Sequence, residues 1–323
     1  MQPGDITLRD IYRARRTIAP YVRRTPLARS ASLSAKTGAE VCLKLESLQD
    51  TGAFKLRGAT NRLMHLSEAE RARGVIAVST GNHGRGVSAA ARRLGIRAVI
   101  CMSDLVPDNK IQAIKDLGAD VRIVGHSQDD AEVEARRLVD EEGLVWVSPF
   151  DDPFVIAGQG TIGLELLEDM PDIDTAIVPL SGGGLIGGIA LALKSASRGI
   201  RVIGVTMENG AAMYESQRAG KPVPVDEEPS LADCLTGSLG LENHYTFDLV
   251  RDHVDDMLLV SEEQIADAIR HAYRQERLIV EGGASVGIAA LLHGLAGDIG
   301  AKAVVVISGG NIDMDKFDRV VNG

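Results

Sequence analysis

Short runs of aliphatic residues alternate along most of the chain with segments whose apolar residues recur at helical spacing. Strands spaced by helices favour right-handed βαβ crossovers and a parallel sheet covered on both faces, so we expect two α/β sheets. A capping box at Ser261 and Gln264 predicts the start of one helix. The predicted strands are Val75–Ser79, Arg97–Met102, Val121–Val124, Leu144–Val147, Thr175–Leu180, Arg201–Thr206, Met257–Val260 and Ala303–Ile307, with helices at Gly86–Leu94, Asn109–Leu117 and Asp130–Glu142 between the first four.

Composition narrows the class of protein. The 323 residues, of which 45% are hydrophobic and 25% charged, are ordinary for a soluble globular protein of about two domains. A formal net charge of −10 argues against nucleic acid or an anionic membrane as a partner. The cysteines at positions 42, 101 and 234 are far apart and lack paired spacing, so we expect no disulfide framework or zinc site, and a cytoplasmic location.

One uncharged stretch, Ala176–Leu193, approaches the length of a membrane span. Pro179 and a cluster of glycines interrupt it, and its halves read as a strand and a small-residue helix joined by a turn. We therefore expect no membrane span. The first residues also lack the basic segment and apolar run of a secretory signal.

Three predicted strands end in glycine-rich or polar turns, at the edge where α/β proteins bind ligands. The turn Ser79–Gly84 offers amides and hydroxyls at a helix start, which suits a carboxylate, although a capped turn alone is the simpler interpretation. The turn Ser181–Leu185 contains three consecutive glycines, so its backbone could wrap a phosphate. The turn Ser308–Asn311 presents a hydroxyl, or is a bare C-terminal turn.

The middle turn has an alternative interpretation. Gly182, Gly184 and Gly187 satisfy the dinucleotide-binding spacing, and Glu208 follows the next strand at about the offset of a ribose-binding acid. This alternative predicts an NAD-dependent enzyme, and it leaves the other two turns without a purpose.

A lysine suited to covalent chemistry lies at position 55. If the chain is helical from Phe54, Gly58 and Ala59 lie one turn beyond Lys55 and leave the surface beside its amine bare. An ammonium among apolar groups loses solvation, so its pKa falls and the free amine can form an imine with an aldehyde cofactor. The alternative is a solvated helix lysine.

Together these motifs resemble fold-type II pyridoxal-phosphate enzymes, within them the serine/threonine dehydratase and serine racemase family. The similarity runs from about Ile11 to Asn311 and includes the segments Arg24–Leu27, Lys44–Glu46 and Gly158–Thr161. The resemblance implies a tryptophan synthase β-like α/β fold of two domains, each a mainly parallel sheet flanked by helices, with the active site in the cleft between them. It also implies a large cofactor-binding domain at 1–52 and 149–323 and a small domain at 53–148.

The resemblance implies roles for individual residues. Lys55 is the Schiff-base lysine and the general base, and Thr80 stands where racemases carry a second catalytic base. Asn82 contacts the phenolic oxygen of pyridoxal 5'-phosphate, and Ser308 its pyridine nitrogen. The implied cofactor-binding residues are Phe54, Lys55, Asn82, Ser181, Gly182, Gly183, Gly184, Leu185 and Ser308, and the implied substrate-binding residues are Ser79, Thr80, Gly81, Asn82 and His83.

The implied activity is a dehydratase, or ammonia-lyase, that converts a β-hydroxy amino acid to a 2-oxo acid and ammonia. A racemase, a β-replacement enzyme or, less plausibly, a non-catalytic scaffold are the alternatives. His83–Arg85 and Gly237–Asn243 look most like the dehydratases of hydroxyectoine utilisation. Family members suggest a homodimer.

Two departures from the family matter for chemistry. Thr206 and Ala212 stand where metal-binding relatives have carboxylates, so no metal site is expected. Arg85 stands where relatives more often carry a neutral side chain; it meets a distal substrate carboxylate or caps a solvated helix face, and the second interpretation is favoured.

Overall fold

The computed structural model describes residues 6–79, 81–106 and 108–323, which form two sheets. The six-stranded sheet has the order β1 (Leu27–Arg29), β2 (Glu40–Leu45), β10 (Lys302–Ile307), β7 (Thr175–Pro179), β8 (Arg201–Met207) and β9 (Asp256–Val260). The four-stranded sheet has the order β5 (Asp120–Ile123), β4 (Ala98–Met102), β3 (Val75–Val78) and β6 (Val145–Trp146). Neighbouring strands are parallel in both sheets, except that β1 is antiparallel to β2.

Helices cover both faces of the six-stranded sheet, because the side chains of a strand alternate between them. In β10, Val305 and Ile307 enter one hydrophobic core, and Val304 and Val306 enter the other. The first core contains residues of α2 (Ala31–Thr37), α12 (Glu262–His271), α13 (Gly282–Leu292) and α14 (Met314–Asn322), and a π-helical turn Ala272–Glu276 follows α12. The second contains residues of α8 (Pro153–Asp169), α9 (Gly184–Ala196), α10 (Ala212–Ala219) and α11 (Thr246–His253), while α1 (Leu8–Ile18) packs on α8 and α9.

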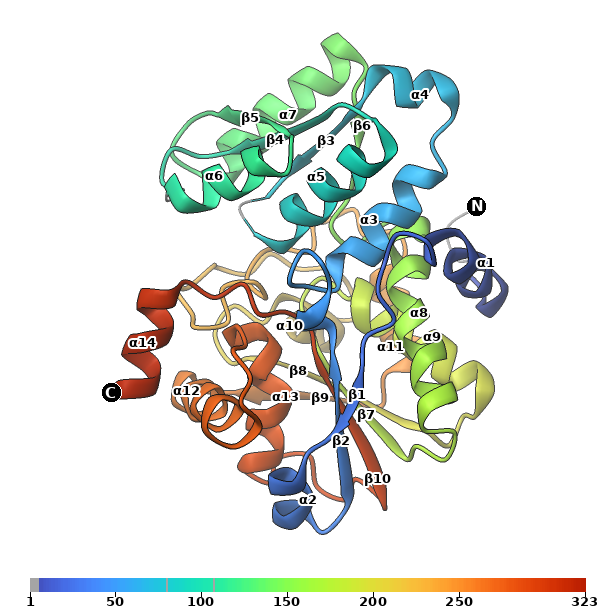
Figure 1. The fold of residues 1–323 in the computed structure, drawn as a ribbon, viewed down its shortest axis with the longest axis vertical. Helices are drawn as coiled ribbons and strands as arrows, with labels where there is room; N and C mark the ends of the chain where they lie inside the picture. The colour runs from blue at the N-terminus through green and yellow to red at the C-terminus, as the bar shows by residue number, and fades with distance from the viewer. Residues whose placement is uncertain (1–5, 80, 107) are drawn as a thin grey trace.

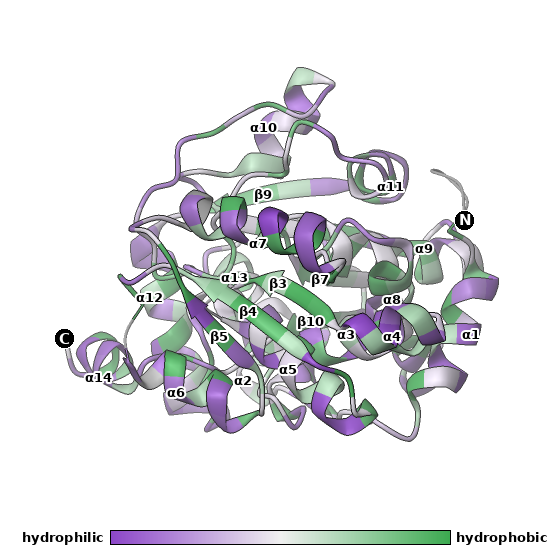
Figure 2. Cartoon of the chain, turned by 90° about the horizontal axis from the view of Figure 1, so that it is seen from above, coloured by the Kyte–Doolittle hydropathy of each residue, from purple (hydrophilic) through white to green (hydrophobic). Residues whose placement is uncertain are grey.

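The four-stranded sheet and its helices lie above the larger sheet in the view of Figure 1, with α3 between the two. One face packs on α3 (Lys55–Met64), α5 (Asn82–Leu94) and α6 (Asp108–Asp116), and the other on α7 (Gln128–Glu142). The remaining helices are α4 (Glu68–Arg73) and the 3₁₀ turn Glu46–Leu48. Figure 2 shows β3 and β4 as hydrophobic and the edge strand β5 as largely hydrophilic, in line with the exposure of most of β5.

All eight predicted strands are confirmed to within one residue at each end, and the capping box at Ser261 and Gln264 is present. Helix α5 begins at Asn82, four residues before the predicted start at Gly86, so the first turn of the helix contains part of the polar motif. The antiparallel pair β1 and β2 was not predicted. The proposed domain limits, 1–52 with 149–323 and 53–148, stay a prediction.

The uncharged stretch Ala176–Leu193 divides into β7, a glycine turn and α9. Within the described parts of the chain, no helix combines the length and apolar character that crossing a membrane requires.

Candidate active site

Several of the predicted site residues meet at the carboxyl end of β10. Lys55 is the first residue of α3, and Phe54 immediately precedes the helix. The backbone amide of Phe54 donates to the carbonyl of Ser308 at 3.0 Å, and Ala53 forms an isolated bridge with Gly309. The lysine segment and the last glycine turn, some 250 residues apart in sequence, are therefore joined by backbone hydrogen bonds.

The amine of Lys55 is largely removed from solvent. Its Nζ donates to the carbonyl of Pro149 at 2.6 Å and lies 5.2 Å from the centroid of the Phe54 ring. Burial lowers the pKa of Lys55 to about 8, although the charges of Cys234 and Glu281 act in the opposite direction. The solvated-lysine alternative is therefore wrong, and the amine is available in neutral form near physiological pH.

The cause of this setting differs from the one expected. A Cβ added to Gly58 would lie 2.9 Å from Val155 Cγ1, so Gly58 serves the packing of α3 on α8 and does not leave the amine bare. The glycine that adjoins Lys55 is Gly86 of α5, where an added Cβ would lie 3.1 Å from the Lys55 carbonyl carbon. Helix α5 thus packs directly on the backbone of Lys55.

The lowered pKa of Lys55 predicts how the cofactor-free protein reacts with pyridoxal phosphate. At pH 8 about half of an amine with a pKa of about 8 is neutral, against roughly 0.3% for an ordinary lysine. Covalent attachment at Lys55 should therefore accelerate between about pH 7 and pH 9 and then level off. Borohydride reduction followed by peptide mass spectrometry measures the rate of attachment at Lys55, and the exposed Lys115 is the internal control. A midpoint above about pH 10 would contradict the buried setting.

The glycine turn before α9 forms an open anion cradle. Gly183 has φ of +87°, no side chain caps α9, and the backbone amides of residues 182–186 donate to no backbone carbonyl in the described ranges. A Cβ on Gly182 would lie 2.3 Å from the Phe150 ring, and one on Gly183 would lie 2.7 Å from Met213 Cε. Free amides at a helix start suit a phosphate, and only glycine fits here. Leu185 packs its side chain into the core, which leaves only its amide for a ligand.

Phe150 connects this cradle to the lysine, because it follows Pro149, the acceptor of the Lys55 amine. Beneath the cradle lies Gln159 of α8, which is fully buried. Its Oε1 lies 2.8 Å from the position of an added Cβ on Gly184, and neither of its amide atoms has a hydrogen-bond partner in the described residues. An unpartnered amide below a set of free backbone amides is consistent with a site that binds a polar group.

The buried carboxyl group of Glu281, which no sequence motif indicates, lies beside Asn82. Asn82 Nδ2 donates to Glu281 Oε1 at 2.6 Å, and Asn311 Nδ2 donates to Asn82 Oδ1 at 2.7 Å. A Cβ added to Gly309 would lie 2.1 Å from the same Glu281 oxygen. Burial raises the pKa of Glu281 to about 7, against the opposing effect of the Asn82 hydrogen bond. Glu281 therefore fixes the orientation of the Asn82 amide.

The predicted carboxylate loop is only partly described, since Thr80 lies outside the described residues. The hydroxyl of Ser79 accepts from the amide of Gly81 at 3.2 Å. His83 is buried, and its Nε2 donates to the carbonyl of Val147 at 2.8 Å. Burial lowers the pKa of His83 to about 3, so its ring is neutral and serves to hold the loop on the four-stranded sheet. Because the His83 ring is used in this way, only the backbone of His83 is available to contact a substrate.

Four buried charges fix the start of α3. Arg57 Nε donates to Glu46 Oε2 at 2.8 Å and Arg57 Nη1 to Glu165 Oε1 at 2.6 Å. Lys44 Nζ lies 2.6 Å from Glu165 Oε2. The two cations and two carboxylates balance, as buried charges require. Because Arg57 is two residues from Lys55, this cluster connects the lysine to β2 and α8.

Arg85 lies one turn into α5 and is half-buried. Burial lowers its pKa, so Arg85 is less solvated than a cap on a helix face exposed to water would be, and its role stays a prediction.

The positions of the family's metal ligands hold Thr206 and Ala212, both buried. Across the part of the chain that the structure describes, no group of three His, Cys, Asp or Glu side chains could hold a metal ion. The expectation that no metal is needed stays a prediction.

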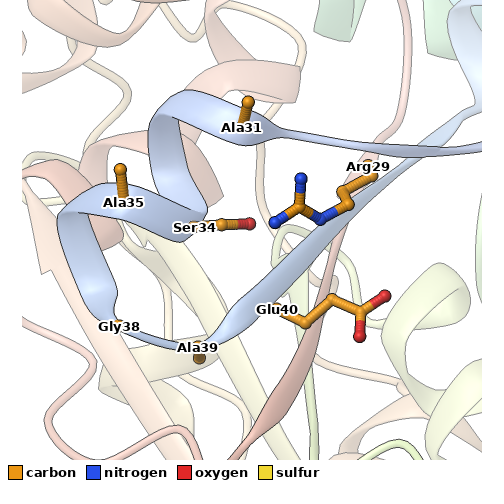
Figure 3. Close-up of a pocket in the computed structure, with 7 residues that line it drawn as sticks. All are labelled: Arg29, Ala31, Ser34, Ala35, Gly38, Ala39 and Glu40. Atoms are coloured by element: carbon orange, nitrogen blue, oxygen red, sulfur yellow. The ribbon is translucent and has the colours of Figure 1, made fainter.

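A surface pocket lies away from these residues, between β1, α2 and β2 (Figure 3). Its residue Glu40 pairs with Lys302, the first residue of β10, so the pocket is at the opposite end of the sheet from Ser308. Its serine, Ser34, accepts from the Val41 amide at 3.0 Å. None of the predicted site residues lines it.

Comparison with known proteins places most of the chain in one group of enzymes. The family model for pyridoxal-phosphate-dependent enzymes matches residues 18–310. An L-threonine ammonia-lyase of Thermotoga maritima is 48% identical over 318 residues, which are 98% of this chain and 78% of the relative. The processed form of threonine deaminase isoform 2 from Solanum lycopersicum has a TM-score of 0.92 at 35% identity, covering 98% of this chain and 86% of that one. Maize serine racemase has a TM-score of 0.91 at 35% identity, covering 98% and 97%.

Proposed function

Because this chain belongs to the pyridoxal-phosphate-dependent enzymes, we propose that it eliminates water from threonine and related β-hydroxy amino acids to give a 2-oxo acid and ammonia. It is a lyase with the two-sheet α/β fold of that family, and its cofactor is pyridoxal phosphate. The dinucleotide alternative for Gly182, Gly184 and Gly187 is set aside for that reason. The single observation that carries the proposal is the lysine amine with a lowered pKa beside a cradle of free amides.

We assign the cofactor-holding roles to residues that fit the group. The amides of residues 182–185 would bind the phosphate, Asn82 and Ser308 would contact the ring of the cofactor, and Phe54 borders the Lys55 amine. Pyridoxal phosphate, when bound, supplies an electron sink for negative charge at the substrate α-carbon.

The chain's own residues then move one proton and hold the substrate. The neutral Lys55 amine takes the α-proton, for which a pKa of about 8 is well matched. The loop 79–83 binds the substrate carboxylate through backbone amides and hydroxyls at the start of α5. Glu281 keeps the Asn82 amide in one orientation throughout.

A substrate panel tests this proposal. The purified holoprotein is assayed for 2-oxo acid and ammonia with serine, threonine, 3-hydroxyaspartate and hydroxyectoine-derived hydroxy amino acids. The proposal expects turnover of at least one member with equal amounts of both products. No 2-oxo acid from any member would refute it.

The finer assignments remain hypotheses of this proposal. Hydroxyectoine utilisation rests on the resemblance of His83–Arg85 and Gly237–Asn243 alone. Racemisation would need a second base at Thr80, and β-replacement would need an added nucleophile. The homodimer and the cytoplasmic location stay predictions.

The proposed enzyme should be insensitive to metal removal. Hard divalent cations need several oxygen ligands. Thr206 and Ala212 stand where metal-binding relatives have carboxylates, and neither residue has a carboxylate side chain. Turnover measured before and after treatment with a chelator should agree within about two-fold. A large loss that magnesium or calcium restores would reveal a site built from other residues.

A further inference from the structure

Arg85 is placed to reach the substrate. It lies three residues after Asn82 on the same face of α5, a rise of about 4.5 Å along the helix. Side chains of a helix lean toward its amino end, so a guanidinium at this position can reach toward Asn82 and the carboxylate loop. The charge of Glu281, the hydrogen-bond partner of Asn82, opposes the lowering of the Arg85 pKa, so the two groups are close enough to interact electrostatically.

Arg85 differs from the other buried and half-buried arginines that the structure describes, because it has no partner. Among the arginines of the described ranges that are buried or half-buried, it alone makes no hydrogen bond and no ion pair. The six others are Arg15, Arg57, Arg62, Arg71, Arg201 and Arg270, each bonded to a carboxylate or a carbonyl. Burial lowers the pKa of Arg85, and only Glu281 opposes this. A half-buried guanidinium without a partner has lost part of its solvation with no fixed anion in return, and a ligand carboxylate would supply that anion.

Glu281 does not supply that anion. Its Oε1 accepts from Asn82, and it makes no ion pair with Arg85 within 4.0 Å. Burial also raises the pKa of Glu281 to about 7, so it is only partly charged at neutral pH. Among the described residues, the site therefore has a cation one turn beyond the carboxylate loop and no fixed counter-ion for it.

The other anions of the proposed reaction have their own sites. The cofactor phosphate belongs at the start of α9 and the substrate α-carboxylate at the start of α5. We infer that Arg85 binds a second carboxylate on the substrate side chain, and that the preferred substrates are β-hydroxy-α-amino dicarboxylic acids such as 3-hydroxyaspartate. This inference rests on the proposed function for its chemistry. The guanidinium fork binds a carboxylate through two parallel hydrogen bonds, which a neutral side chain cannot replace.

Binding of non-reacting amino acids tests the contact without turnover. Aspartate and alanine share the α-carboxylate and lack a β-hydroxyl, and only aspartate has a distal carboxylate. Calorimetric titration of the holoprotein should give roughly 10- to 100-fold tighter binding of aspartate. Arg85→Gln should abolish this preference and leave alanine binding unchanged, while Arg85→Lys should retain part of it. Arg92→Gln, on the exposed side of the same helix, is the control and should keep the preference.

Three other outcomes of this titration would overturn the inference. Equal binding of aspartate and alanine by the wild type would exclude a distal-carboxylate site. Equal weakening of both in Arg85→Gln, at an unchanged melting temperature, would show that Arg85 binds the α-carboxylate or the cofactor instead. An aspartate preference that survives Arg85→Gln would place the site elsewhere.

Kinetics then separate this inference from the proposed function. In Arg85→Gln the KM for 3-hydroxyaspartate should rise about 10-fold or more, with the KM for threonine unchanged. An aspartate preference that depends on Arg85, without elimination from any hydroxy amino acid, would refute the proposed function and uphold the contact. Elimination from threonine with no preference for diacids would uphold the proposed function and refute the Arg85 contact.

Discussion

Replacing Lys55 by alanine should lower turnover by about 10⁴-fold or more while the protein remains folded. The substitution removes the covalent anchor of the cofactor and the base that takes the α-proton. It also removes a buried amine whose pKa burial lowers to about 8, so the loss of its hydrogen bond to the Pro149 carbonyl is offset by the loss of an unfavourable buried charge. Initial rates of 2-oxo acid formation and the melting temperature are measured on the same preparation.

A matched control comes from the exposed lysine of α6. Lys115→Ala should keep the wild-type rate and cofactor absorbance. Near wild-type elimination by Lys55→Ala would show that another residue performs the chemistry. A large fall in melting temperature would show that Lys55 supports the fold instead.

Replacing Arg57 by methionine should lower the free energy of unfolding by about 3–5 kcal/mol. Arg57 is 1% exposed and donates to Glu46 and to Glu165, so its removal leaves two carboxylates in the interior with only Lys44 to balance them. Denaturant titration of wild type and variant gives the difference directly.

The four-stranded sheet offers a comparable arginine at the surface. Arg97 also pairs with two carboxylates, Asp120 and Glu142, but its side chain is 42% exposed. Arg97→Met should therefore cost at most about 1 kcal/mol. A similar loss for the two variants would contradict the role of burial in the Arg57 cluster.

What the sequence predicted correctly depends on local signals. The strands of both sheets follow from short aliphatic runs, and the cradle at 182–184 follows from three adjacent glycines at a strand end. The predicted start of α5 at Gly86 is four residues late because Gly84 argues against a helix by propensity, although Gly84 and Gly86 both lie within it. Both allow close approach, since an added Cβ on Gly84 would lie 2.9 Å from the Ser79 carbonyl oxygen.

What the sequence did not predict depends on partners that are far apart along the chain. Glu281 is 199 residues from Asn82, and its position before Gly282 at a helix start was the one available signal. Arg57 and Glu165 are 108 residues apart, and no local pattern distinguishes them from surface charges. That Arg85 has no partner is a property of the assembled structure, which no single segment encodes.

The central claim is elimination of water at the Lys55 site, and one measurement separates it from the alternatives. Holoprotein is incubated with L-threonine in deuterated water, without added nucleophile, and the products are followed by proton NMR. The account predicts 2-oxobutanoate and ammonia as the main products, in equal amounts, and no reaction in Lys55→Ala. Conversion of threonine to its α-epimer without 2-oxobutanoate would identify a racemase and contradict it.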